Sequence, residues 1–317
     1  QPPDLREIHA MTAPLPISHV GFATSPGRGD LASLEASIAA IVDLGADVVE
    51  LGLFGEDLVS GGRIIEGRAK RFAEICGQFD IRYTVHGLIV SNFMDEAHLA
   101  YQKAAVAAMI ELCDRIGADT LVHHSGRATN GSRPQLRHHD QIERAALAEM
   151  AVVAARHGIR IALENIFAVS DAEYRQLPSE VAATVRSVGS PHLVGLIDFS
   201  HAYIEATRTG ADLRHEVLAM APVTGHLHVH DSFGRPYTMD KFYYTSEAIA
   251  LGIGDLHLPL GWGDLPFEAL FDEIEVMPGT ALIMEIGERF AAERADSLER
   301  ARALAARVNA RHAAAAA

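Results

Sequence analysis

Residues 225–231 read GHLHVHD, and residues 255–257 read DLH. The first segment alternates polar and apolar side chains, which is typical of a β-strand, and the second ends the polar, aromatic-rich excursion that follows it. Imidazoles and carboxylates at this density, with no cysteine among them, suit a hard or borderline divalent metal ion. The stretch therefore predicts a strand of a larger sheet with a metal site at one end.

The same order of apolar strand, loop and amphipathic helix recurs about eight times along the chain. Strands are predicted at 17–22, 48–53, 81–85, 120–123, 159–163, 193–197, 224–229 and 281–284. Helices fill most of the gaps, among them 31–44, 63–79, 95–116 and 297–308, with Asp30 and Asp296 as N-caps of the first and last. Eight strands each followed by a helix, with no linker between them, predict an α/β fold with a single (β/α)8 TIM barrel at residues 11–312.

The loop after the seventh strand is longer than this fold requires. Thr224 and Ala281, where the seventh and eighth strands start, are 57 residues apart. The surplus predicts an insertion at 231–254, which we expect to lie over the barrel mouth. Its candidate substrate-binding side chains are the cations Arg235 and Lys241 and the aromatics Tyr237, Phe242, Tyr243 and Tyr244. The alternative is a surface insertion that packs its aromatic side chains on the outer helices.

Composition disfavours several classes of partner. Lys and Arg number 27 against 42 Asp and Glu, a net charge of −15 that disfavours nucleic acid and anionic membranes, although a metal cluster can reverse the sign locally. Cys76 and Cys113 both fall in predicted helices, so we expect no disulfide framework and a reducing, cytoplasmic location. The sequence shows no apolar run near 18 residues, so no membrane span is expected.

Every predicted strand from the third onward ends at or beside a side chain that can bind a metal ion. These side chains are His86, His123, His124, Glu164, Asp198, His201, His228 and Glu285. A single strand-end histidine is more often a hydrogen-bonded structural residue, whereas Glu164 and Glu285 end apolar strands and need a cation or several donors. Because barrels of this kind carry their chemistry at the C-terminal ends of the strands, the whole set predicts a metal centre there.

These strand-end motifs resemble those of the xylose-isomerase-like barrels, a superfamily of sugar isomerases and epimerases that also includes endonuclease IV. The resemblance extends over residues 17–308. It is carried by Val85-His86 with Asn92, His124-Ser125-Gly126, Asp198-Phe199-Ser200-His201-Ala202, and Asp255-Leu256-His257 with Gly261-Trp262-Gly263. Residues 19–25 and Trp262 depart from the nuclease pattern, which places the DNA-reading loops in doubt.

The resemblance implies up to three zinc or manganese ions per chain. The first would bind His86, His124 and Glu164. The second would bind Glu164, Asp198, His228 and Glu285, which correspond to the single metal site of the sugar epimerases, and the third would bind His201, Asp255 and His257. His226 and His230 flank His228 at two-residue spacing and either orient the ligands or are simply polar strand-end residues.

Three clustered divalent ions favour phosphoester cleavage over rearrangement of a carbon skeleton. We therefore predict a metal-dependent hydrolase that cleaves a small-molecule phosphodiester, with Glu164 and Glu285 as catalytic residues. The first alternative is a sugar or sugar-phosphate isomerase or epimerase with one divalent metal, in which the same two residues move the proton. An abasic-site endonuclease is a further alternative, although the charge and the insertion disfavour duplex DNA as a partner. A non-enzymatic metal-binding protein is least favoured, and the oligomeric state stays open.

Overall fold

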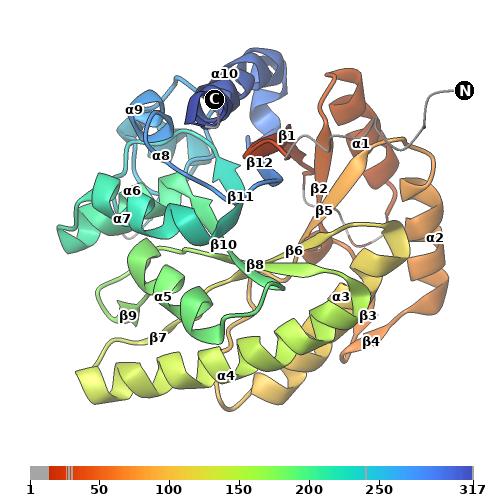
Figure 1. The fold of residues 1–317 in the computed structure, drawn as a ribbon, viewed down its shortest axis with the longest axis horizontal. Coiled ribbons are helices and arrows are strands. Elements are labelled where there is room, and N and C mark those ends of the chain that lie inside the picture. Colours follow the sequence, from red (N-terminus) through yellow and green to blue (C-terminus); the bar gives the residue numbers. More distant parts are fainter. Residues whose placement is uncertain (1–13, 26, 28, 30, 240, 316–317) are drawn as a thin grey trace, which may run out of the picture.

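Eight parallel strands form a closed barrel at the centre of the protein (Figure 1). The computed structural model describes residues 14–25, 27, 29, 31–239 and 241–315. The barrel strands are β1 (Ile17–Ala23), β2 (Val48–Gly52), β5 (Arg82–His86), β6 (Thr120–His124), β8 (Arg160–Glu164), β10 (Leu193–Asp198), β11 (Thr224–Val229) and β12 (Thr280–Met284). Each pairs in parallel with the next one in this order, and β12 pairs with β1. The predicted (β/α)8 barrel is confirmed.

The barrel strands are largely buried because both of their faces are covered. In β10 all six residues are buried, as are all five in β2. Strands covered on both faces are expected to have near-continuous apolar sequences of this kind. Several strands extend one residue beyond the predicted ends, so that His86, His124, Glu164 and Asp198 are the last residues of their strands. The barrel itself therefore holds these side chains at its C-terminal rim.

Helices surround the barrel on its outer side (Figure 1). They are α1 (Leu34–Asp43), α2 (Glu66–Cys76), α3 (Leu99–Ile116), α4 (Arg133–His157), α5 (Pro178–Val188), α6 (Phe199–Thr209), α7 (Leu213–Met220), α8 (Thr245–Leu251), α9 (Phe267–Phe271) and α10 (Arg294–Ala315), with 3₁₀ turns η1 (Leu53–Gly55), η2 (Ala221–Val223) and η3 (Glu288–Glu293). None of the helices in the described part of the chain is long and apolar enough to cross a membrane.

Helix boundaries differ from the prediction by a few residues. The helices predicted at 31–44, 63–79 and 95–116 start later than expected, and α10 extends beyond 297–308 at both ends. Asp296 lies in the first turn of α10 and does not precede it, so its prediction as an N-cap is wrong. Asp30 lies outside the described residues. The limits of the single domain, 11 and 312, stay a prediction.

Two short antiparallel ribbons lie outside the barrel. One pairs β3 (Val59–Ser60) with β4 (Arg63–Ile64), and the other pairs β7 (Ala128–Thr129) with β9 (Glu173–Tyr174). The second ribbon joins the loops that follow β6 and β8, since β7 follows β6 and β9 follows β8 in the chain. The predicted insertion at 231–254 contains α8, and isolated bridges fix its two ends, Asp231 to Leu258 and Arg235 to Ile253.

Candidate metal centre

A cavity of about 850 Å³ opens at the C-terminal end of the barrel. Of the nine predicted metal ligands, seven line it: His86, His124, Glu164, His201, Asp255, His257 and Glu285. The other two, Asp198 and His228, are fully buried beneath it. Apolar side chains form much of the wall, among them Phe54, Ile166, Phe167, Ile286 and Phe290. The structure thus brings the predicted ligands together on the floor of one largely apolar cavity.

Glu164 lies at the centre of the cluster. Its Oε2 is 3.6 Å from His86 Nε2 and 3.4 Å from His124 Nε2. Its Oε1 is 3.1 Å from His201 Nδ1 and 3.6 Å from His228 Nδ1. Burial alone would raise the pKa of Glu164, but the charges of His124 and His228 outweigh it and hold the pKa well below its ordinary range. Glu164 is therefore a carboxylate with imidazoles around both oxygens.

His228 connects Glu164 with the carboxylate at the end of the last strand. Its Nδ1 lies 3.5 Å from Glu285 Oε2, on the side that also faces Glu164. Asp198, His228 and Glu285 each offer one ligand atom, and these atoms lie within 4.8 Å of one another. Two carboxylates and one imidazole at this spacing, with Glu164 beside them, match the donor types of a divalent metal site.

Asp255 is the centre of a neighbouring cluster of imidazoles. Its Oδ2 lies 2.9 Å from His257 Nε2 and 3.3 Å from His201 Nε2, and its Oδ1 lies 3.5 Å from His230 Nε2. His257 has a positive φ of 47°, a backbone conformation that residues other than glycine rarely adopt. Its Nδ1 donates to the backbone carbonyl of Glu285 at 2.7 Å, so Nε2 is the atom directed to Asp255. His230, for which an orienting role and simple strand-end polarity were both open, reaches the cluster directly.

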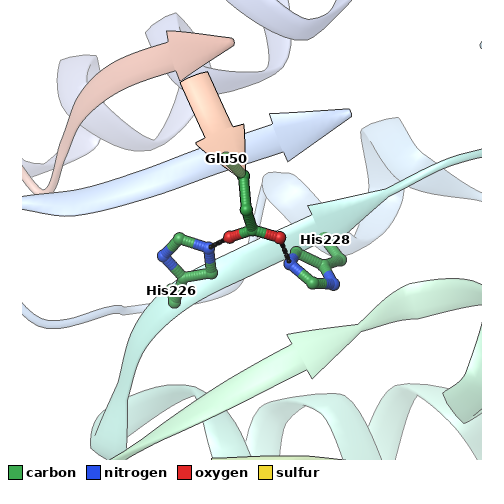
Figure 2. Close-up of side chains that lie close together, drawn as sticks. All are labelled: Glu50, His226 and His228. Atoms are coloured by element: carbon green, nitrogen blue, oxygen red, sulfur yellow. Dashed lines mark hydrogen bonds and ion pairs between the residues drawn. The ribbon is translucent and has the colours of Figure 1, made fainter. Parts of the chain in front are cut away.

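Glu50 bridges two histidines of β11, and sequence analysis missed it (Figure 2). Its Oε2 is 2.8 Å from His226 Nε2, and its Oε1 is 2.9 Å from His228 Nε2. Thr84 Oγ1 also donates to Oε2, at 3.0 Å. Burial alone would raise the pKa of Glu50, but the charges of His228 and His226 hold it well below its ordinary range. Because the Glu50 carboxylate lies on the Nε2 side of His228, the Nδ1 atom is the one that faces Glu164 and Glu285.

The residues present fit a divalent metal ion. Within the described residues, five groups of three have their ligand atoms within 4.8 Å of one another, and all are built from imidazole and carboxylate donors. Both oxygens of Glu164 and Oδ1 of Asp255 are buried without a hydrogen-bond partner. Buried carboxylate oxygens are rarely left this way, because each unpaired charge carries a large desolvation penalty. A bound cation would satisfy them.

The predicted substrate-binding cations of the insertion lie away from the cavity lining. Arg235 donates to the carbonyl of Leu251 and lies over the Phe233 ring, and Lys241 lies over the exposed Tyr243 ring. Their role in substrate binding, and that of Tyr243, stays a prediction. Tyr237 does reach the site: its ring is 5.9 Å from that of Phe167, and its hydroxyl accepts the backbone N–H of Asp255 at 3.2 Å. The cavity is instead lined by Arg127, Arg175 and Arg289, which sequence analysis did not single out.

The model of the xylose isomerase-like TIM barrel family matches residues 38–308. The chain belongs to this family. This confirms the resemblance that the strand-end motifs indicated. A comparison with curated protein sequences found no significant match.

Solved structures of similar fold cover nearly the whole chain. A D-tagatose 3-epimerase-like protein is 18% identical, covers 92% of this chain and 99% of its own, and has a TM-score of 0.67. D-Psicose 3-epimerase from Clostridium cellulolyticum H10, solved with D-tagatose, is 13% identical, covers 90% and 99%, and has a TM-score of 0.65. A protein from Thermus thermophilus, soaked with zinc chloride, is 19% identical, covers 91% and 98%, and has a TM-score of 0.64.

The comparisons contradict the prediction of a phosphodiesterase. Two of the three structures bear the names of sugar epimerases. The prediction rested on the number of metal ligands, and that number does not determine which bond reacts. The same nine side chains can serve either reaction class, because both use a divalent ion to stabilise developing negative charge on oxygen. The alternative of a sugar isomerase or epimerase is the better supported.

Proposed function

We propose that the protein is a metal-dependent enzyme that isomerises or epimerises a sugar at the floor of the barrel cavity. The observation that carries the proposal is the placement of two carboxylates around one imidazole. Glu164 and Glu285 approach the same atom, His228 Nδ1, at 3.6 and 3.5 Å, and both line the cavity. The sugar epimerases of similar fold support this choice of substrate class.

Glu164, Asp198, His228 and Glu285 would hold the metal ion nearest the reaction. A second ion would bind His201, Asp255 and His257, with His230 beside them. A third would bind His86, His124 and Glu164, which gives up to three sites for zinc or manganese. A divalent ion bound to a ketose carbonyl makes the adjacent C–H bond more acidic. The ion nearest Glu285 is the one that the proposed reaction requires.

Proton transfer is the task of the protein's own side chains. Epimerisation removes a proton from the carbon that bears the inverted hydroxyl and returns a proton to its opposite face. Glu164, held as a carboxylate by the surrounding imidazoles, can accept the first proton. Glu285, less buried and at the cavity edge, can supply the second. The apolar wall, including Phe54, Ile166 and Phe167, restricts water near the reacting carbon.

The test is turnover of a panel of ketoses and aldoses by protein loaded with zinc or manganese, with chromatography of the products. The native protein should form an epimer or isomer of at least one sugar. Glu164→Gln and Glu285→Gln should each lower kcat by orders of magnitude, since either change removes a proton-transfer group. Glu149→Gln is the matched control, because Glu149 is an exposed carboxylate that pairs with Lys103 and does not line the cavity. Native turnover in both site variants would overturn the assignment.

A further inference from the structure

Two arginines flank the β7–β9 ribbon beside the cavity, at positions that its register places opposite each other. Ala128 pairs with Tyr174 and Thr129 with Glu173 in an antiparallel register. Arg127 precedes Ala128 and Arg175 follows Tyr174, so they are the next pair in that register. Both side chains line the cavity. Figure 1 shows β7 and β9 next to each other, beside the strands β6 and β8 that carry His124 and Glu164.

Like charges at facing positions of a strand pair destabilise it. Arg175 is largely buried, with 11% of its side chain exposed. The ribbon register and the shared cavity wall place the Arg127 side chain near that of Arg175. Burial lowers the pKa of Arg175, Glu173 raises it, and the charge of Arg127 lowers it further, as repulsion between the two guanidinium groups requires. A negatively charged group between them would remove this repulsion.

The ribbon holds both arginines in place but leaves donors free. Arg175 Nε donates to Glu173 Oε1 at 2.9 Å, and its Nη1 donates to the carbonyl of Ser125 at 3.1 Å. The backbone of Arg127 is fixed on both sides by the Asn92 amide, at 2.9 and 2.8 Å. Within the described residues the Arg127 guanidinium makes no hydrogen bond or ion pair. In the described part of the chain the Arg127 guanidinium is therefore without a counter-ion, although the net charge of the protein is −15.

The arginine pair is joined to the metal centre through one short loop. His124, whose Nε2 is 3.4 Å from Glu164, is followed by Ser125, whose carbonyl binds Arg175. Arg127 follows two residues later. The arginine pair and His124 therefore line the same cavity. The third cavity arginine, Arg289, belongs to another loop and has its own contacts, with Ser246 and the Phe290 ring.

We propose that Arg127 and Arg175 form a subsite for an anionic group, a phosphate or a carboxylate, carried by the sugar substrate. Guanidinium groups recognise both kinds of oxyanion through paired N–H donors. That the ligand is a sugar rests on the proposed function. That it carries a negative charge rests only on the two arginines beside the ribbon. The substrate is then an acidic sugar, either a sugar phosphate or a sugar acid.

The test is isothermal titration calorimetry with a neutral ketohexose, its terminal phosphate ester and the corresponding keto-sugar acid. Native protein should bind one acidic sugar more tightly than the neutral one. Arg127→Gln and Arg175→Gln should each weaken that binding about 10- to 100-fold, the usual range for a hydrogen bond to a charged group, and leave the neutral sugar unchanged. The acidic sugar that loses affinity identifies the phosphate or the carboxylate as the recognised group.

Controls separate the subsite from other effects. Arg289→Gln changes a third arginine that lines the same cavity and lies in η3, and it should leave the preference for the acidic sugar intact. Because metal ions also attract phosphate, each titration is made with metal-loaded and with chelator-treated protein. Arg127→Gln removes an exposed, unpaired side chain, so its melting temperature should match that of the native protein and its result stays interpretable if Arg175→Gln misfolds.

The outcomes distinguish the subsite from the proposed reaction. Equal native affinity for neutral and acidic sugars would overturn the subsite, even if neutral sugars are epimerised. An equal loss of affinity for neutral and acidic sugars in Arg127→Gln would overturn the subsite as well. Arginine-dependent binding of an acidic sugar that is never turned over would support the subsite and contradict the proposed function.

Discussion

Replacement of Glu50 by glutamine should weaken metal binding at His228 without a change of shape in the barrel. The Glu50 carboxylate is fully buried and contacts two imidazoles at once. It is hydrogen-bonded to His226 at 2.8 Å and forms an ion pair with His228 Nε2 at 2.9 Å. Glutamine has one acceptor oxygen and one donor group in the same place. When its NH2 faces His228 Nε2, the proton of His228 must move to Nδ1, the atom that faces Glu164 and Glu285. A protonated Nδ1 cannot bind a metal ion.

The expected loss of metal affinity is moderate, because Glu50 contacts the metal ligand His228 and is not a metal ligand itself. Loss of such a partner usually weakens metal affinity 10- to 100-fold, or about 1.4 to 2.7 kcal/mol. The matched control is Thr84→Val, because Thr84 donates to the same carboxylate at 3.0 Å and has no contact with His228. Thr84→Val should leave the metal affinity close to native.

The assay is competition for zinc with a chromophoric chelator, together with the metal content after gel filtration. We expect Glu50→Gln to lose the tight metal ion nearest Glu285 and to keep its secondary structure by circular dichroism. Native zinc affinity in Glu50→Gln would refute the reasoning about the His228 tautomer. So would an equal loss in Thr84→Val, since that would show a general effect of repacking around Glu50.

Three further predictions concern stability. Burial raises the pKa of Glu143 from its ordinary 4.5 to about 7. The protonated side chain therefore contributes folding stability below pH 4.5, on the order of 3 kcal/mol, and this contribution is lost as the pH rises through 7. Glu143→Gln should unfold at higher urea than native protein at pH 8 but not at pH 4, and equal midpoints at pH 8 would contradict this. Chelator should lower the melting temperature in calorimetry, because metal at about 1,000 times its Kd contributes about 4 kcal/mol; an unchanged melting temperature would count against a bound metal. Gly126→Ala should lower the melting temperature and the metal content, since the added Cβ would lie 2.4 Å from Met94 Cγ, whereas Gly67→Ala, with open space around it, should do neither.

The rim of the barrel was predictable because local sequence encodes it. An apolar run that ends in His86, Glu164 or Asp198 indicates both a buried strand and its C-terminal end, and eight repeats indicate closure. The structure moves these residues by one position, from just after the strands to their last residues. The predicted metal ligands at the strand ends reach the cavity lining or lie buried below it. His123 is the exception, because its ring packs against the buried Phe93 ring at 4.3 Å and does not line the cavity.

Contacts between distant segments were not predictable from the same pattern. Glu50 is 176 residues away from His226 in the chain, and only closure of the barrel brings β2 opposite β11. The available signal was a glutamate inside the apolar run Val48 to Leu51, which by the argument applied to Glu164 also needed a partner. Arg127 and Arg175 depend on a two-residue ribbon whose register no sequence period indicates.

The predicted cations of the insertion do not line the cavity, and their role in substrate binding stays a prediction. Arg235 and Lys241 were predicted to bind substrate because they lie in the sequence between two predicted metal ligands, His228 and Asp255. In the folded chain Arg235 hydrogen-bonds to the end of α8, and Lys241 lies against an aromatic ring of its own loop. Tyr237 reaches Asp255 because residues 235 and 253 pair and fold the loop back on the site.

Proton exchange at carbon tests the central claim most directly. Metal-loaded protein is incubated with neutral and acidic ketoses in D2O, and the sugars are followed by proton NMR. We predict that one ketose forms its epimer with deuterium at the inverted carbon beside the carbonyl, and that chelator and Glu164→Gln each abolish the change. Metal-loaded native protein that leaves every C–H bond of these sugars unaltered would contradict the account.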